Sequence, residues 1–214
     1  MLEKNNSNVT VCNHPLIKAL VTEIRDKKTE GKRFRRLVKE LARHIVYEAL
    51  SDIPLKEVEF ETPLAKTRGF TFMCEQFILA PILRAGLSMI DGALETLPGA
   101  EIRHIGLYRD EATLEPVEYY IKLPESIPEE TYVLLMDPML ATGGSATIAV
   151  DTFKKRGVKK IKFLCLISSI QGINALSEAH PDIQIYTAAI DPILNELGYI
   201  VPGLGDAGDR SFGT

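Results

Sequence analysis

The residues best suited to chemistry lie in one stretch, 132–147, which reads YVLLMDPMLATGGSAT. A carboxylate, Asp137, is followed there by a loop of small residues that includes Thr142, Gly143, Gly144 and Ser145. Glycines let the backbone approach a ligand closely, so that several N–H groups converge on one oxyanion. The loop therefore predicts a phosphate site. The carboxylate beside it is an acceptor for hydroxyl groups, and the combination favours a sugar phosphate as ligand.

The same stretch predicts the elements that position these groups. Residues 132–136 form a continuous apolar run, which is typical of a strand buried on both faces. Residues 146–156 are predicted to be a helix that Gly157 ends. This order places a helix N-terminus, with its favourable dipole, at the loop. The loop is not a Walker A sequence, because no lysine follows the glycines, and it lacks the G-x-G-x-x-G of dinucleotide sites.

The rest of the chain predicts an α/β fold. Helices are expected over 14–27, 34–50, 87–96 and 172–179, and strands over 58–63, 72–81, 101–108, 117–123, 160–168 and 183–190. Alternating strands and helices predict a parallel sheet with helices on both faces. Ligands of such sheets bind at the carboxyl ends of the strands, where Arg84, Asp137, Ser168 and Ser169 are expected to gather.

Composition excludes several classes of protein. The 214 residues suit a single domain, 1–214, and the net charge of -4 gives no grip on nucleic acid or on an anionic membrane. No apolar run is long enough to span a membrane, and the N-terminal MLEKNNSNVT lacks a signal-peptide core. The three cysteines and four histidines lack the spacing of a disulfide framework or a metal site. A cytoplasmic protein is expected.

Four separate motifs carry a resemblance to a known family. DPMLATGGS at 137–145 resembles the phosphoribosyl pyrophosphate (PRPP) motif of the type I phosphoribosyltransferases, and its proline makes it similar to that of the uracil phosphoribosyltransferases. PILRAGL at 81–87, YRDEATLEPVEYY at 108–120 and PGLGDAGDRSFGT at 202–214 resemble the same family. The resemblance implies a type I phosphoribosyltransferase fold, with a central, mostly parallel sheet flanked by helices. It also implies an N-terminal helical region (1–52), a β-hairpin flexible loop, and a C-terminal base-binding hood (198–214).

The resemblance also implies a reaction: transfer of the phosphoribosyl group from PRPP to N1 of uracil, giving UMP and diphosphate. Mg²⁺ is expected to be held mainly through PRPP. The implied catalytic residues are Arg84, Arg109, Asp137 and Asp206. For PRPP they are joined by Pro138, Met139, Leu140, Ala141, Thr142, Gly143, Gly144 and Ser145. Uracil is expected to meet backbone groups of Ile200, Gly205, Asp206 and Ala207. Cytosine would leave some of those groups unpaired, and this favours its rejection. No general base is evident.

Several alternatives stay open on the sequence alone. Arg84 also suits a salt bridge to a nearby carboxylate, and the basic run 32–36 suits either an anion site or the solvated first turn of a helix. Ile170 and Gln171 stand where relatives often carry proline and glutamate. Competing functions are a phosphoribosyltransferase for another base and an inactive regulator that senses PRPP or binds RNA. The resemblance further implies a homodimer or higher homo-oligomer, with GTP as a candidate activator.

Overall fold

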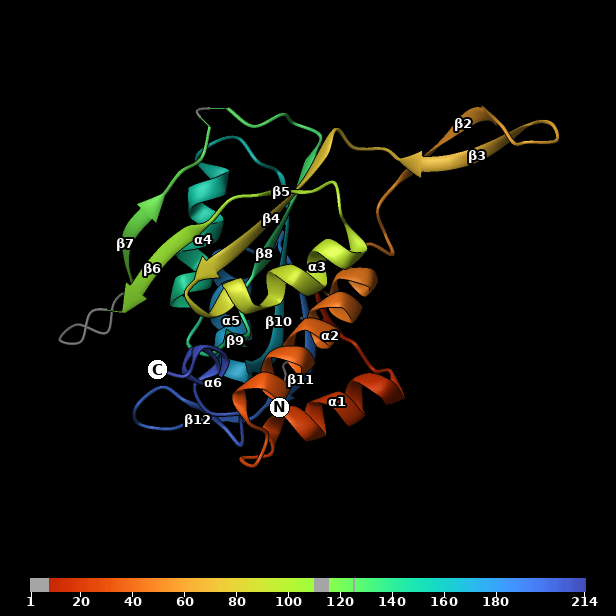
Figure 1. The fold of residues 1–214 in the computed structure, drawn as a ribbon. Coiled ribbons are helices and arrows are strands. Elements are labelled where there is room, and N and C mark those ends of the chain that lie inside the picture. The colour runs from red at the N-terminus through yellow and green to blue at the C-terminus, as the bar shows by residue number, and fades with distance from the viewer. Residues whose placement is uncertain (1–7, 110–115, 125) are drawn as a thin grey trace.

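A central sheet organises the molecule (Figure 1). The computed structural model describes residues 8–109, 116–124 and 126–214. The strand order is β1-β11-β10-β8-β4-β6-β7, and every neighbouring pair on this path is parallel except β6 and β7. The bounds are β1 Val9–Val11, β4 Gln76–Leu83, β6 Ile105–Arg109, β7 Pro116–Ile121, β8 Thr131–Met136, β10 Lys160–Ser169 and β11 Gln184–Asp191. Two short strands, β5 (Glu101–Ile102) and β9 (Met139–Leu140), pair with β4 and β10.

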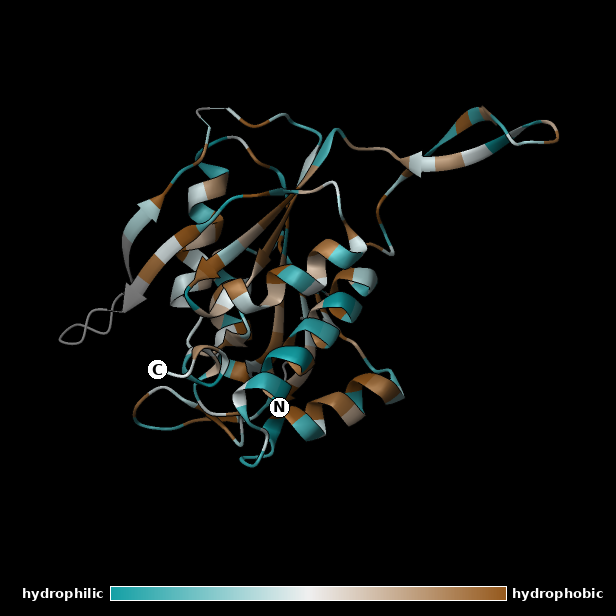
Figure 2. Cartoon of the chain, viewed as in Figure 1, coloured by the Kyte–Doolittle hydropathy of each residue, from teal (hydrophilic) through white to brown (hydrophobic). Residues whose placement is uncertain are grey.

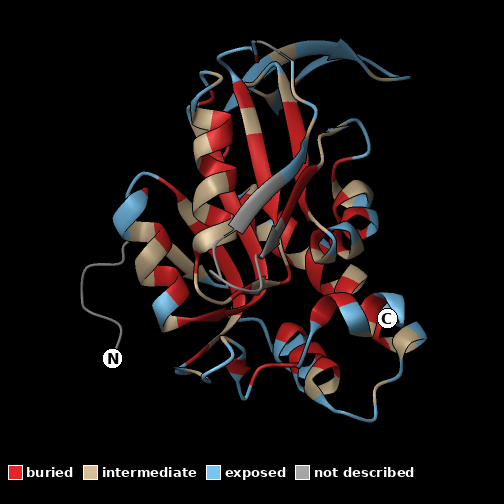
Figure 3. Ribbon diagram, turned by 90° about the vertical axis from the view of Figure 1, so that its left-hand side faces the viewer, coloured by how far each residue is buried: buried red, intermediate tan, exposed pale blue. Residues whose placement is uncertain are grey.

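Helices cover both faces of the sheet, as predicted. The helices α1 (Pro15–Arg25), α2 (Gly31–Ala49) and α3 (Ile90–Thr96) contribute buried residues to one apolar cluster. A second cluster lies on the opposite face and contains residues of α4 (Gly144–Lys154) and α5 (Ile170–Ala179). The strands between these layers are buried along most of their length (Figure 3). The fold class predicted from the sequence is therefore confirmed.

Strand β8 shows why its sequence is apolar without a break. Successive side chains of a strand point to opposite faces of the sheet. Leu134 and Met136 belong to the cluster beneath α2, whereas Val133 and Leu135 belong to the cluster beneath α4 and α5. Because both faces are covered by helices, neither set tolerates a polar residue. Figure 2 shows the hydrophobic colour concentrated on these central strands.

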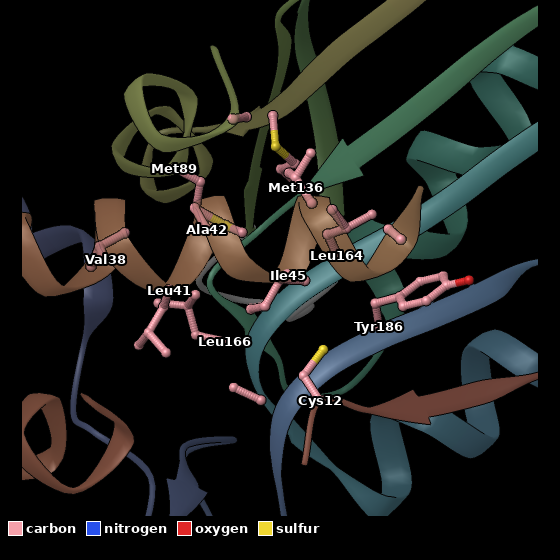
Figure 4. Packing of buried hydrophobic residues seen from close by; sticks show 14 of the residues in the cluster. Cys12, Val38, Leu41, Ala42, Ile45, Met89, Met136, Leu164, Leu166 and Tyr186 are labelled. Atoms are coloured by element: carbon pink, nitrogen blue, oxygen red, sulfur yellow. The ribbon is translucent and has the colours of Figure 1, made fainter. Parts of the chain in front are cut away.

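Helix α2 is the main cover of the first face. Its buried residues include Leu37, Leu41, Ile45 and Ala49, which form an apolar stripe along one face of the helix. Figure 4 shows Leu41 and Ile45 of the helix together with Met136, Leu164, Leu166 and Tyr186 of the sheet, all of which belong to this cluster. Phe34 near the start of the helix is fully buried as well.

An antiparallel arm extends away from the body of the molecule (Figure 1). It consists of β2 (Leu55–Glu61) and β3 (Lys66–Phe72). The strands expected over 58–63 and 72–81 correspond to β2 and β4 with shifted bounds, whereas β3 was missed, and Phe72 closes the arm instead of opening β4. The arm has no buried residues, and Leu64 and Phe70 are largely exposed.

Smaller corrections concern the ends of other elements. Residues Ala85–Met89 form a 3-10 helix, so α3 is shorter than the helix expected over 87–96. The strand expected over 101–108 is divided into β5 and β6. The hairpin of β6 and β7 is antiparallel, as predicted, and its tip at 110–115 lies outside the described residues. Among the described residues, no helix has the length and apolar character needed to cross a membrane.

Candidate active site

The predicted site residues meet at the carboxyl edge of the sheet. Arg84 follows β4, Asp137 follows β8, and Ser169 ends β10. The strands are parallel and in register, with Met136 opposite both Pro81 and Leu164. Their carboxyl ends therefore open onto one side of the molecule.

The phosphate loop is anchored to the end of β10. The Ser169 hydroxyl donates a hydrogen bond to the Ala141 carbonyl oxygen at 2.6 Å and accepts one from the Gly172 N–H at 2.8 Å. The Pro138 carbonyl oxygen accepts hydrogen bonds from Leu166 and Ile167 N–H at 2.9 and 3.1 Å. A Cβ at Gly172 would lie 2.4 Å from the Ala141 carbonyl oxygen, so only glycine permits this approach.

The loop ends at the N-terminus of α4 and encloses a small cavity of about 50 Å³. Gly143, with φ of 89°, precedes the first turn of α4 in a conformation that favours glycine. Seven predicted PRPP residues line the cavity: Asp137, Met139, Leu140, Ala141, Thr142, Gly143 and Ser145. Backbone groups at a helix N-terminus provide the donors that a phosphate requires. Pro138 and Gly144 are not among the residues that line it.

The hood, defined as residues 198–214, lies against this loop. It contains β13 (Ile200–Val201), paired with β12 (Ile193–Leu194), and the short helix α6 (Ala207–Phe212). A cavity of about 220 Å³ is lined by the four predicted uracil residues, Ile200, Gly205, Asp206 and Ala207, together with Asp137, Met139, Ala141 and Ser145 of the loop. Tyr199, Gly198, Gly208 and Ala85 complete the lining. One space thus joins the two motifs that the sequence predicts for sugar phosphate and base.

The two carboxylates of this cavity have different surroundings. Loss of solvent around Asp137 raises the pKa of its carboxyl to about 7, the Met139 N–H lowers it, and the negative charge of Asp206 raises it. The backbone N–H of Met139 is 3.4 Å from Asp137 Oδ1. Asp206 is exposed, and its Oδ1 accepts a hydrogen bond from Asp209 N–H at 2.9 Å, which caps α6.

The predicted arginines lie at the edge of the site. Arg84 Nη2 is 3.7 Å from Asp209 Oδ1, and both side chains are at least half exposed. The salt-bridge alternative therefore describes the structure, but the pair is long and solvated and leaves Arg84 able to turn toward a ligand. Arg109 ends β6, and its side chain lies outside the described residues.

The basic run 32–36 lies in the first turns of α2. Arg33 and Arg36 form exposed ion pairs with Glu23 and Glu40, which favours the solvated-turn interpretation for them. Arg35 instead donates a hydrogen bond to the Ser211 carbonyl oxygen of the hood at 2.9 Å.

Two carboxylates of the site are candidate ligands for Mg²⁺. Among the described residues, no group of three or more His, Cys, Asp or Glu side chains could enclose a metal. Asp137 and Asp206 do line one cavity, and their charges interact. Mg²⁺ bound beside phosphates needs only one or two carboxylates, so these residues fit such an ion.

Sequence analysis missed the residues that attach the hood to the body. Arg25, at the end of α1, forms a two-pronged ion pair with Asp191. Arg210 on α6 donates hydrogen bonds to backbone carbonyl groups of residues 24–29. Asp191 could have been recognised, because it ends an apolar strand in the same way as Asp137. Ile200 and Leu204 bury the apolar side of the hood, whereas Tyr199, Val201 and Phe212 are substantially exposed.

The sheet order, the phosphate loop at the end of β8 and the hood define a type I phosphoribosyltransferase. The adenine phosphoribosyltransferase of Trypanosoma brucei, solved with AMP, pyrophosphate and ribose 5-phosphate, shares this fold with a TM-score of 0.54 at 12% identity, over 93% of this chain and 88% of that one. The uracil phosphoribosyltransferase family model matches residues 11–214, and the chain belongs to that family.

Close relatives agree with this family. The uracil phosphoribosyltransferase of Streptococcus pneumoniae is 55% identical over 206 residues, covering 96% of this chain and 98% of that one. A solved protein from Aquifex aeolicus superposes with a TM-score of 0.90 at 39% identity, covering 95% of this chain and 97% of that one.

Proposed function

We propose that the protein transfers the phosphoribosyl group of PRPP to N1 of uracil, forming UMP and diphosphate. The observation that supports this most is the shared cavity, which is lined by Asp137, Met139, Ala141 and Ser145 of the loop and by Ile200 and Gly205 to Ala207 of the hood. A sugar phosphate and a base placed there would be held side by side. Holding two reactants in a reactive geometry accounts for a large part of such catalysis.

In this proposal each part of the site has one task. Backbone N–H groups of the loop and the N-terminus of α4 bind the 5′-phosphate, and Asp137 binds the ribose hydroxyls. Arg84 and Arg109 bind the departing diphosphate. Uracil N1 attacks C1 of the ribose as the bond to diphosphate breaks, through a transition state with oxocarbenium character. When bound through PRPP, Mg²⁺ supplies further positive charge to the diphosphate.

The base is recognised by backbone groups of the hood. The edge of uracil presents an acceptor, a donor and an acceptor, and N–H and C=O groups of Ile200 and of Gly205 to Ala207 are its partners in this proposal. Cytosine reverses two of these three positions, so that polar groups of a closed site would stay unpaired. Adenine and orotate differ from uracil in shape or charge.

We further propose that no dedicated general base is needed, because N1 of uracil is itself acidic. If a general base did exist, Asp206 would be the best-placed candidate, because it lines the base side of the cavity. The pH dependence of the rate should therefore keep its shape in Asp206→Asn. A single sharp ionisation that disappears in this variant would refute the hypothesis.

The deciding experiment is UMP formation from uracil and PRPP with Mg²⁺, run beside cytosine, hypoxanthine and orotate. Turnover with uracil alone is expected, and a chelator should abolish it. Turnover with another base would mean that the hood does not select uracil. PRPP binding without turnover of any base would favour the inactive regulator instead.

We also propose a homodimer or higher homo-oligomer in the cytoplasm, with GTP as an activator. The exposed arm supports an oligomer, because Leu64 and Phe70 expose apolar surface on a hairpin that extends away from the body of the molecule. Phe70→Ser should shift sedimentation toward the monomer and leave the melting temperature nearly unchanged.

The proposed activation by GTP is tested by measuring the rate of UMP formation at low PRPP with and without GTP. Equal rates would remove GTP from the proposal.

A further inference from the structure

In the proposed function the hood recognises the base with backbone groups. Its selectivity for the base therefore depends on how firmly the backbone of the hood is held in place. A side chain can change rotamer to recover a contact, whereas a backbone carbonyl moves only with the whole segment. Sites of this kind must be held to about 0.5 Å by surrounding residues, and a displacement of about 1 Å can cost about a hundredfold in rate. The residues that hold the hood are therefore part of base recognition.

A buried ion pair holds the turn before the base-reading residues. Arg25 Nη1 and Nη2 lie 2.7 Å from the two carboxylate oxygens of Asp191, whose side chain is only 6% exposed. Arg25 Nη1 also donates to the Gly203 carbonyl oxygen at 2.8 Å, and Asp191 Oδ2 accepts from the Gly203 N–H at 2.8 Å. Both backbone groups of Gly203 are thus fixed by one ion pair.

Gly203 transmits this position to the neighbouring hood residues. The turn from Ile200 to Gly203 is tight, since a Cβ at Gly203 would lie 2.1 Å from the Ile200 carbonyl oxygen. Gly205 follows two residues later and lines the base side of the cavity with Ile200. A shift of Gly203 would therefore move the backbone on both sides of the proposed uracil site.

Arg210 holds the other side of the same segment. Its guanidinium donates to the Leu204 carbonyl oxygen at 2.7 Å, and to those of Ile24, Asp26 and Thr29 at 2.8, 2.8 and 3.0 Å. It also lies 4.3 Å from the centre of the Phe34 ring, and Phe34 is fully buried. One side chain thus joins the hood to the connection between α1 and α2.

We propose that Arg25, Asp191 and Arg210, here called the brace, are positioning residues that set the affinity and selectivity for the base. They act through Gly203 and Leu204 on the backbone groups that meet the base, and do not themselves line the cavity. The N-terminal helical region is by this argument a determinant of base recognition, although its residues lie outside the site. This inference rests on the proposed function, because it assigns base reading to the hood.

Arg25→Lys is the first test, because lysine keeps the charge but loses the two-pronged contact. The expected result is a KM for uracil raised about tenfold, with a KM for PRPP within about twofold of wild type. Arg33→Lys is the matched control. Arg33 makes an equally two-pronged ion pair with Glu23 between α1 and α2, at 2.6 Å for both contacts, and its hydrogen-bond partners in the described chain do not include the hood. It should change neither KM.

Hydrogen exchange gives a readout that does not depend on turnover. Backbone amides of residues 200–208 should exchange faster in Arg25→Lys and Arg210→Lys than in wild type, while those of the central strand β8 stay unchanged. Asp191→Asn provides an independent variant, should one of the arginine replacements fail to fold.

The outcomes separate the two proposals. Unchanged exchange in the hood, or a KM for PRPP that rises as much as the KM for uracil, overturns the brace as a determinant of base recognition. Absence of UMP formation by the wild-type protein overturns the proposed function, and faster exchange confined to the hood would then still establish the brace as its support.

Discussion

The raised pKa of Asp137 makes a quantitative prediction about stability. The pKa of the Asp137 carboxyl rises from its ordinary value of 3.8 to about 7 in the folded protein. A raised pKa means that the folded state binds the proton more tightly than the unfolded state, so the stabilising contribution is complete below about pH 4 and is lost as pH rises through about 7. Each pKa unit corresponds to about 1.36 kcal/mol, so the full loss is about 4 kcal/mol.

Asp137→Asn removes this ionisation while nearly preserving shape. At pH 5 part of the stabilising contribution of protonated Asp137 has already been lost. About 2.5 kcal/mol of it remains to be lost between pH 5 and pH 8. The free energy of unfolding of the variant, measured with urea and compared with wild type, should therefore gain about 2.5 kcal/mol over that interval. The variant gains this stability by losing a carboxylate that the proposed site requires. UMP formation by the variant should therefore fall sharply.

Glu129→Gln is the control for general effects of removing a negative charge. The hydrogen bond from Lys159 lowers the pKa of Glu129, and the pair is exposed, so its pH dependence should be weak and opposite in sign. A stability difference between Asp137→Asn and wild type that is the same at pH 5 and pH 8 would refute the reasoning. It would mean that solvent in the cavity keeps the pKa of the Asp137 carboxyl near its ordinary value in the folded state.

Two further predictions concern packing. Gly172→Ala places a Cβ 2.4 Å from the Ala141 carbonyl oxygen and should displace the phosphate loop, raising the KM for PRPP about tenfold or more; an unchanged KM would show that the loop does not depend on this approach. Phe153→Ala leaves a cavity at a fully buried position on α4 and should lower the free energy of unfolding by about 3–5 kcal/mol, measured with urea at neutral pH. A loss below about 1 kcal/mol would contradict the packing described.

The sequence predicted the parts of the fold that bury apolar surface in a regular pattern. The strand at 132–136 was recognised because its residues are apolar without a break, and helix α2 because its apolar residues recur along one helix face. The arm strand Lys66–Phe72 escaped because neither of its faces is buried, so its sequence carries no alternation of apolar and polar residues.

The candidate site was predictable to a similar extent. The phosphate loop and the hood are contiguous motifs, and the structure brings their residues to one cavity. The pairing within the brace could not be predicted, even though Asp191 itself ends an apolar strand. The contacts that join Arg25 and Arg210 to distant parts of the chain span 166 to 186 positions and involve single arginines and backbone carbonyl groups. Such contacts follow no period and leave no local pattern in the sequence.

The brace also fixes the order in which the protein can become complete during synthesis. Ile24 accepts a hydrogen bond from Arg210, which is added to the chain 186 residues later. At about 5–20 residues per second, the ribosome needs roughly 10–40 seconds to make that interval. Throughout this time α1 and α2 have no hood to hold, whereas the phosphate loop can form as soon as β10 and the start of α5 have been made. The base side of the cavity is therefore the last part of the protein to acquire its shape.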